Sequence, residues 1–233
     1  MPGTGIILPA LNAARFLGPL LDDINLRHPQ LHLLVVDDGS TDGTGETAGA
    51  HGAEVSTHEI NRGKGQALLT GFEWARNRNL DWVLTMDSDG QHLPADLASF
   101  LAFVEADSAD VVVGNRMAAV EGMPWIREMT NRFTSAIVGR LAGTPIPDSQ
   151  NGYRMFRVSF LHDLRLTTTN FDMESEILVR LARRGARITS VPVATVYGEE
   201  ISAIHPWRDT IRFFRLASRL SRDHDDAPGS STS

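Results

Sequence analysis

The chain has 233 residues, 42% of them hydrophobic and 22% charged, a balance typical of folded globular proteins and not of disordered ones. Its formal net charge of −7 argues against a nucleic-acid partner, because such proteins usually present a basic surface. The sequence contains no cysteine, which excludes disulfides, a thiolate nucleophile and cysteine-ligated metal sites.

Apolar runs alternate with amphipathic segments along the first half of the chain. Strands are predicted at residues 6–9, 31–36, 54–58, 82–86 and 110–114, and helices at 13–27, 45–51, 65–78 and 93–103. The strands are almost continuously apolar, as expected for strands covered on both faces. The pattern therefore predicts an α/β fold, with one mostly parallel sheet flanked by helices in a single domain.

The second half of the chain is richer in predicted helix. Helices are expected at residues 124–141 and 171–184, and extended segments at 152–156 and 188–196. No apolar run approaches the roughly 18 residues that a membrane-spanning helix needs, and the N-terminus lacks the features of a signal peptide. We therefore expect a cytoplasmic location.

A basic helix is predicted at residues 206–222, before a disordered tail at 225–233. Its arginines recur at steps of four, three, four and three, which places them on one stripe: Arg208, Arg212, Arg215, Arg219 and Arg222. Such a helix can lie on an anionic membrane surface. It can equally pack on the domain with a solvated arginine face, and the sequence leaves both alternatives open.

Polar residues follow three predicted strands, at the sheet edge where α/β proteins bind ligands. They are Asp37-Asp38, the series Asp87-x-Asp89-x-Gln91, and Asn115-Arg116. Two carboxylates this close repel each other unless a cation binds between them. Their oxygens, with the amide oxygen of Gln91, suit Mg²⁺ or Mn²⁺ completed by substrate phosphates.

Lys64 is the single lysine of the chain and lies between two glycines. A compact ammonium suits phosphate as a point charge where a guanidinium would need more room. Chance retention of one lysine among many arginines is the alternative explanation.

An ordered series of motifs resembles the family 2 glycosyltransferases, which have a GT-A-type fold. The first motifs are Leu8-Pro9-x-x-Asn12, Val35-Val36-Asp37-Asp38-Gly39-Ser40-Thr41-Asp42-Gly43-Thr44, Asn61-Arg62-Gly63-Lys64-Gly65 and Asp87-Ser88-Asp89-Gly90-Gln91-His92. The later motifs resemble the dolichyl- and polyprenyl-phosphate sugar synthases: Gly114-Asn115-Arg116, Asp148-Ser149-Gln150-Asn151-Gly152-Tyr153-Arg154 and Phe171-Asp172-Met173-Glu174. The resemblance covers about residues 5 to 210 in unbroken order.

The resemblance implies one domain at residues 1–224. It divides into a nucleotide-sugar-binding half at 5–116, an acceptor half at 117–205 and the basic helix at 206–222.

The resemblance also implies roles for individual residues. The UDP- or GDP-sugar would be held by Pro9, Asn12, Asp37, Asp38, Lys64 and Asp87, and the metal ion by Asp87, Asp89 and Gln91. The catalytic residues would be Asp89, Arg116, Asp148 and Arg154, and the acceptor side would include Arg127, Arg132, Glu174 and Ser202. Structural roles remain as alternatives: a turn at Asp38, an ion pair between Arg154 and Asp148, a helix-start preference at Glu174 and a supporting role for His92.

The resemblance implies an acceptor that is a polyprenyl or dolichyl phosphate met at the membrane surface, and inversion at the anomeric carbon. A phosphate is already largely ionised at neutral pH, so arginines should dominate its site. A hydroxyl acceptor would instead need a base, for which Asp148 is the candidate.

Two departures from the family pattern bear on ligand binding. Ala13-Ala14-Arg15 stands where acidic residues are usual, and residues 197–202 lack the usual basic residue. A nucleotidyltransferase should carry a Gly-rich basic first loop, which residues 10–15 lack. The intact Asp87, Asp89 and Lys64 speak against a non-enzymatic nucleotide-binding protein.

Overall fold

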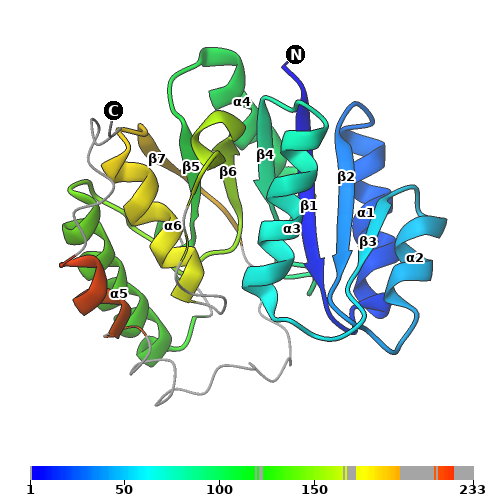
Figure 1. The fold of residues 1–233 in the computed structure, drawn as a ribbon, viewed down its shortest axis with the longest axis horizontal. Coiled ribbons are helices and arrows are strands. Elements are labelled where there is room, and N and C mark those ends of the chain that lie inside the picture. Colours follow the sequence, from blue (N-terminus) through cyan, green and yellow to red (C-terminus); the bar gives the residue numbers. More distant parts are fainter. Residues whose placement is uncertain are drawn as a thin grey trace.

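The computed structural model describes residues 2–118, 120, 123–164, 166, 172–194, 213 and 215–222. Its centre is a seven-stranded sheet with the order β3-β2-β1-β4-β6-β5-β7 (Figure 1). The strands are β1 (Thr4–Ala10), β2 (His32–Asp37), β3 (Glu54–Thr57), β4 (Trp82–Thr85), β5 (Val111–Asn115), β6 (Arg154–Arg157) and β7 (Ile188–Pro192). All neighbouring pairs are parallel except those of β6, which runs against β4 and β5. The prediction of a mostly parallel sheet is confirmed.

Helices cover both faces of this sheet. They are α1 (Ala14–Arg27), α2 (Thr44–Ala50), α3 (Lys64–Asn77), α4 (Leu97–Ala106), α5 (Trp125–Ala142) and α6 (Asp172–Arg183), with short 3₁₀ turns at Pro94–Asp96, Arg116–Ala118 and Val158–Leu161. Alternate residues of each central strand enter opposite layers, as a pleated strand requires. In β1, Ile6 and Leu8 pack with α1 and α4, and Ile7 packs with α3. The two hydrophobic layers bury β1 and β4 along their whole length, which explains the continuous apolar sequence of these central strands.

The parallel register brings the carboxyl ends of three strands to one edge. Ala10 at the end of β1 pairs with Asp37 at the end of β2, and Ile7 pairs with Thr85 at the end of β4. The loops that follow these strands therefore meet above the same edge of the sheet. This arrangement positions the candidate site.

The described part of the C-terminal helix packs on the domain. Phe213, Leu216 and Leu220 are buried in the layer that also contains α6, and the Leu220 carbonyl accepts a hydrogen bond of 2.6 Å from Arg183. Its described arginines, Arg215, Arg219 and Arg222, are exposed. Arg208 and Arg212 lie outside the described residues, as do Ser202 and the tail predicted at 225–233. Among the helices of the described residues, none has both the length and the apolar character required to cross a membrane.

Asp110 joins the strands on the β5 side of the sheet. Its carboxylate accepts hydrogen bonds from the side chains of Arg157 and Arg187, at 2.9 Å each, and from the Arg187 backbone. The Arg187 hydrogen bonds outweigh the opposing effect of burial and lower the pKa of Asp110 to about 2. The carboxylate thus stabilises the fold above its ordinary pKa of 3.8, and the contribution is lost as the pH falls through 2.

Asp110→Asn is therefore expected to lower the free energy of unfolding by about 1–2 kcal/mol at pH 7, a figure that allows for solvent screening at the half-exposed Arg187. The difference from the parent should vanish near pH 2, as followed by urea unfolding across the pH range. Asp23→Asn, which breaks the exposed pair with Arg27, is the control and should cost no more than about 0.5 kcal/mol. A pH-independent loss at Asp110 would contradict this assignment.

Candidate active site

One lysine lies between two carboxylates at the edge of the sheet. Lys64 begins α3, Asp87 follows β4, and Glu174 is in the first turns of α6. The Lys64 Nζ is 2.5 Å from the Asp87 Oδ1 and 2.7 Å from the Glu174 Oε1. The cluster joins three elements that are distant in sequence, and it leaves the Asp87 side chain about one-quarter exposed.

The charges of this cluster fix its protonation. Burial by itself would lower the pKa of Lys64, but the charges of Asp87 and Glu174 outweigh it and raise that pKa. Burial would likewise raise the pKa of Asp87, but the Lys64 charge and the His92 side chain lower it well below its usual range. The ammonium and the carboxylate are thus both charged at neutral pH.

Gly152 forms the surface on which the Asp87 carboxylate lies. A Cβ atom at Gly152 would be 2.7 Å from each Asp87 carboxylate oxygen. The Gly152 carbonyl accepts a hydrogen bond of 2.8 Å from Thr85, the last residue of β4. The loop of residues 148–154 is thereby held against the start of the Asp87 loop.

The residues of the loop after β4 differ in exposure. Asp87, Asp89 and Gln91 are partly exposed, whereas Ser88 and His92 are buried. The Asp89 Oδ1 accepts a hydrogen bond of 2.9 Å from the Gln91 backbone. The three predicted metal ligands, Asp87, Asp89 and Gln91, therefore lie in one loop and are all partly exposed to solvent.

The donor atoms of this loop suit a divalent cation. Carboxylate and amide oxygens are ligands that Mg²⁺ and Mn²⁺ accept, and these ions commonly use few protein ligands together with phosphate oxygens. The described residues contain no group of three or more Asp, Glu or His side chains arranged to hold an ion by themselves. The loop thus fits an ion that is shared with a phosphate ligand.

Ser88 and His92 support the loop from beneath. The Ser88 hydroxyl donates to the Pro9 carbonyl at 2.9 Å, which ties the Asp87 loop to the end of β1. The His92 Nε2 is 3.5 Å from the Asp87 Oδ2, and its ring packs 4.9 Å from the Tyr153 ring. These contacts agree with the supporting role considered for His92.

Asp38 binds protein groups rather than open space. Its buried carboxylate accepts backbone hydrogen bonds from Arg62 at 3.0 Å and Gly63 at 2.7 Å, and it lies 2.6 Å from the His58 Nδ1. These bonds hold the loop that leads into Lys64. The geometry therefore supports a structural role for Asp38, whose side chain is almost completely buried.

Asn12 and Asp37 connect the first two loops. Asn12 has a left-handed backbone with φ of 53°, and its side-chain oxygen accepts from the Thr41 backbone at 3.0 Å. Asp37 is buried and accepts from the Ser40 backbone at 2.9 Å. Both residues shape the loops that follow β1 and β2 through backbone contacts.

Arg116 and Asp148 form a two-point ion pair. The guanidinium donates to both carboxylate oxygens, at 2.8 and 2.9 Å, and the Arg116 backbone donates to one of them at 3.1 Å. Asp148 has no exposed surface. The base role expected for Asp148 is not supported, because a general base must reach its acceptor.

Arg154 is almost completely buried and binds three backbone carbonyls. It donates to Asn151 at 2.7 Å, Ser149 at 2.7 Å and Glu174 at 2.5 Å. Its guanidinium therefore fastens the 148–154 loop to α6, the structural alternative foreseen for it, although its main partners are carbonyls and not Asp148.

The predicted acceptor arginines lie on α5. Arg132 is exposed and pairs with Glu128 at 2.8 Å, one turn earlier, and Arg127 is partly exposed.

Three supporting residues had no role in the sequence prediction: His58, Ser88 and Gly152. Strand alternation after Asp87 was the available signal for Ser88. The roles of Gly152 and His58 depend on contacts between distant segments, which no local pattern reveals.

Gly152→Ala is expected to reduce the rate of the reaction at this site about a hundredfold, because displacing a reacting group by about 1 Å has an effect of that size. The added methyl group must push the Asp87 carboxylate away from Lys64. Gly49→Ala is the matched control, since a Cβ there meets nothing within 4 Å. Parent-like steady-state rates for Gly152→Ala would contradict the packing described for Asp87.

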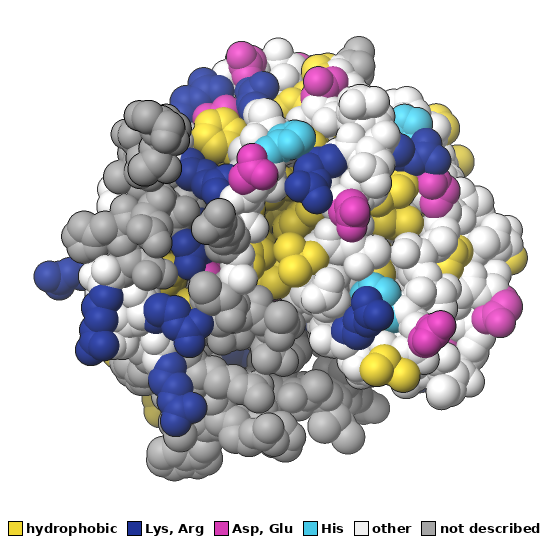
Figure 2. Space-filling model, in the orientation of Figure 1, with side chains coloured by type: hydrophobic (Ala, Val, Ile, Leu, Met, Phe, Trp, Pro, Cys, Tyr) yellow, Lys and Arg dark blue, Asp and Glu magenta, His cyan; other side chains and the backbone are white. Residues whose placement is uncertain are grey.

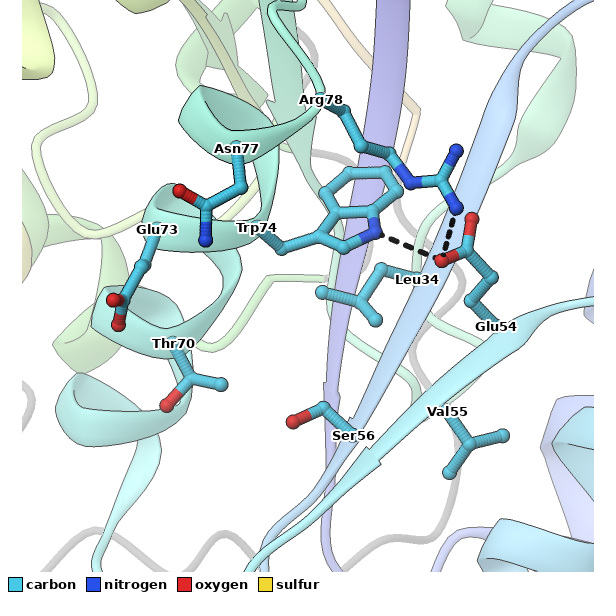
Figure 3. Close-up of a pocket in the computed structure, with 9 residues that line it drawn as sticks. All are labelled: Leu34, Glu54, Val55, Ser56, Thr70, Glu73, Trp74, Asn77 and Arg78. Carbon is cyan, nitrogen blue, oxygen red and sulfur yellow. Dashed lines mark hydrogen bonds and ion pairs between the residues drawn. The ribbon is translucent and has the colours of Figure 1, made fainter.

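A separate pocket of about 460 Å³ lies between β3 and α3 (Figure 3). The Trp74 indole donates to the Glu54 carboxylate at 3.1 Å, and Arg78 pairs with the same oxygen at 2.6 Å. None of the predicted site residues lines this pocket. The Lys64 cluster at the end of β4 is therefore distinct from it.

Comparison with solved structures defines the fold class. The chain superposes on mannosyl-3-phosphoglycerate synthase from Rubrobacter xylanophilus with a TM-score of 0.70 and 22% identity, covering 94% of this chain and 72% of the other. A Mycobacterium tuberculosis glucosyl-3-phosphoglycerate synthase, solved with Mn²⁺, UDP and phosphoglyceric acid, gives a TM-score of 0.71 and 20% identity, covering 94% and 77%. The fold is that of the GT-A glycosyltransferases.

Sequence comparison identifies the family. The family described as Glycosyl transferase family 2 matches residues 5–165. The undecaprenyl-phosphate mannosyltransferase of Micrococcus luteus is 33% identical, covering 92% of this chain and 97% of its own. The polyprenol monophosphomannose synthase of Mycolicibacterium smegmatis is 31% identical, covering 82% and 76%. The chain belongs to glycosyl transferase family 2 and is a glycosyltransferase.

Proposed function

We propose that this enzyme transfers a sugar from a UDP- or GDP-sugar to the phosphate of a polyprenyl or dolichyl phosphate, with inversion at the anomeric carbon. The observation that carries the proposal is the Lys64 cluster at the end of β4, beside which Asp89 and Gln91 also turn outward. The names of the similar proteins support the lipid-phosphate acceptor, and the Mn²⁺ and UDP complexes of the similar structures support the donor.

The donor diphosphate would meet a divalent ion, because the carboxylates around Lys64 outnumber its single positive charge. Mg²⁺ or Mn²⁺ would be held by Asp87, Asp89 and Gln91, and would neutralise the charge of the departing nucleoside diphosphate. Lys64 adds a fixed positive charge at the positive end of α3, where anions are favoured. Its two carboxylate partners would hold the ammonium in place before substrate arrives, as a preorganised electrostatic group.

The acceptor side supports a phosphate better than a hydroxyl. Asp148, the candidate base for a hydroxyl acceptor, is buried against Arg116. A phosphate needs no strong base, since its second pKa is about 6. Arg116, held by Asp148, would be the cation that approaches the acceptor phosphate or the transferred sugar.

The test is an acceptor panel with Mn²⁺ or Mg²⁺ and a set of UDP- and GDP-sugars. Polyprenyl phosphate, the corresponding polyprenol and 3-phosphoglycerate are supplied separately, and glycosylated product is measured by mass spectrometry. Of the three acceptors, we expect only polyprenyl phosphate to give a glycosylated product. Equal turnover with polyprenol, or turnover that ignores the lipid, would overturn the acceptor assignment.

A further inference from the structure

The first half of helix α5 has polar residues inward and apolar residues outward, whereas Ile137, Val138 and Leu141 in its second half pack on the core. Its buried residues are Asn131, Thr134, Ser135 and Val138. Its exposed side chains include Trp125 at 68%, Ile126 at 62%, Met129 at 61% and Phe133 at 57% relative exposure. Spacings of four and eight residues place Trp125, Met129 and Phe133 on one side of the helix. This orientation is opposite to that of an ordinary surface helix.

The inward polar residues are fixed by specific hydrogen bonds. The Ser135 hydroxyl accepts from the Ser149 backbone at 2.8 Å and donates to the Ser149 hydroxyl at 3.2 Å. Thr134 donates to the Thr130 carbonyl at 2.9 Å within the helix. These bonds attach α5 to the loop that carries Asp148, so the outward direction of the apolar face follows from the packing of the site. A clustered apolar face of this kind marks a docking surface.

Positive charge surrounds the apolar face. Arg132 and Arg140 are exposed on the outward side of α5, and the adjoining residues 213–222 present Arg215, Arg219 and Arg222 to solvent. Glu128 is the single acidic residue in α5 and residues 213–222, although the whole chain carries a net charge of −7. Figure 2 shows Lys and Arg side chains gathered over this side of the molecule, with the acidic side chains mostly elsewhere.

We propose that the outward face of α5 docks on an anionic lipid bilayer. Trp125, Ile126 and Met129 would enter the boundary between headgroups and acyl chains, as apolar and aromatic residues of interfacial helices do. The surrounding arginines would pair with lipid phosphates. The inference extends the proposed function, because a lipid-phosphate acceptor is met at a bilayer, but it rests on exposure, spacing and charge alone.

Charge distinguishes the bilayer from a second copy of the chain. A symmetric contact through α5 would bring Arg132 and Arg140 of two copies toward the same arginines, and like charges facing each other disfavour association. An anionic membrane surface attracts all of them. The bilayer is thus the occupant that the charge pattern favours.

The experiment measures binding of the full chain to vesicles, without donor or acceptor. Sedimentation is compared for vesicles of phosphatidylcholine alone and of an equal mixture with phosphatidylglycerol. Ile126→Ser/Met129→Ser removes two apolar side chains from the face. Leu26→Ser/Ile60→Ser is the matched control, because these side chains are 82% and 70% exposed on other elements.

We expect binding to the anionic vesicles, a loss of about tenfold or more for Ile126→Ser/Met129→Ser, and parent-like binding for the control. Arg132→Gln/Arg140→Gln should reduce the preference for anionic vesicles. Equal binding by the parent and Ile126→Ser/Met129→Ser would overturn the proposal. So would a parent dimer in sedimentation velocity that Ile126→Ser/Met129→Ser dissolves, since it would assign the face to a second copy.

The outcomes separate this proposal from the proposed function. If the parent fails to bind vesicles but still transfers sugar to detergent-dispersed polyprenyl phosphate, the docking proposal is overturned and the proposed function stands. If the parent binds anionic vesicles but transfers no sugar to polyprenyl phosphate, the docking proposal stands and the acceptor assignment is overturned.

Discussion

Lys64→Met is expected to reduce sugar transfer by about two to three orders of magnitude, the effect typical of losing one preorganised electrostatic group. Methionine keeps the length of the side chain and removes its charge. In the parent, the Asp87 and Glu174 carboxylates lie 2.5 and 2.7 Å from the Lys64 ammonium. In Lys64→Met they would lose this shared partner and repel each other. The measurement is kcat with saturating donor and acceptor.

The pH dependence of Lys64→Met provides a second, independent readout. In the parent, the Lys64 charge helps to lower the pKa of Asp87, so this carboxylate stays ionised as the pH falls. Without the ammonium the pKa of Asp87 rises, and the acid limb of the pH–rate profile should move to higher pH. Arg76→Met, a loss of positive charge at the other end of α3, is the control. An unshifted acid limb together with a parent-like kcat would contradict the role given to Lys64.

Arg116→Gln is expected to lower the free energy of unfolding by about 3–5 kcal/mol, the usual effect of removing one partner from a buried ion pair. Asp148 has no exposed surface, so its carboxylate would remain buried without its two-point partner. Urea unfolding measures the change directly.

The double variant Arg116→Gln/Asp148→Asn separates charge burial from other losses. Removing both charges should recover most of the stability that Arg116→Gln loses, because no unpaired carboxylate remains. Activity should stay low in the double variant, since the positive charge on the acceptor side is gone. A double variant no more stable than Arg116→Gln would show that the pair does not determine this stability.

The strands of the sheet could be predicted from the sequence because the signal for each strand lies within the strand itself. Residues 6–9 and 82–86 are short apolar runs bounded by turn residues, and covered parallel strands require such runs. The antiparallel direction of β6 was not foreseen. β6 has only four residues, Arg154–Arg157, and its direction is set by pairing with β4 and β5, which are distant in sequence.

The candidate site was predictable where it follows the end of a buried strand. Asp87, Asp89 and Gln91 come directly after β4, at the carboxyl edge of the sheet where side chains become partly exposed. The contact of Lys64 with Glu174 was not predictable, because it joins α3 to α6 through tertiary packing. The same limit applies to Arg154, whose motif suggested a catalytic residue but whose guanidinium binds backbone carbonyls.

The surface helices show a further limit of sequence patterns. The arginine stripe of the last helix did not show whether its other side packs on the domain or on a membrane. In the structure, Phe213, Leu216 and Leu220 are buried against the domain. For residues 124–141 the sequence predicted a helix but not which of its faces is buried. The Ser135–Ser149 hydrogen bonds and the packing of Val138 on the core fix that face, and both involve segments outside the helix.

Binding of a nucleoside diphosphate is the most direct test of the site at the end of β4. Titration calorimetry of UDP and GDP is performed with and without Mn²⁺, on the parent and on Asp89→Asn. The site described here predicts binding of one of the two nucleotides that requires Mn²⁺ and weakens about tenfold or more in Asp89→Asn. Binding of equal strength without the metal ion, unchanged by Asp89→Asn, would contradict it.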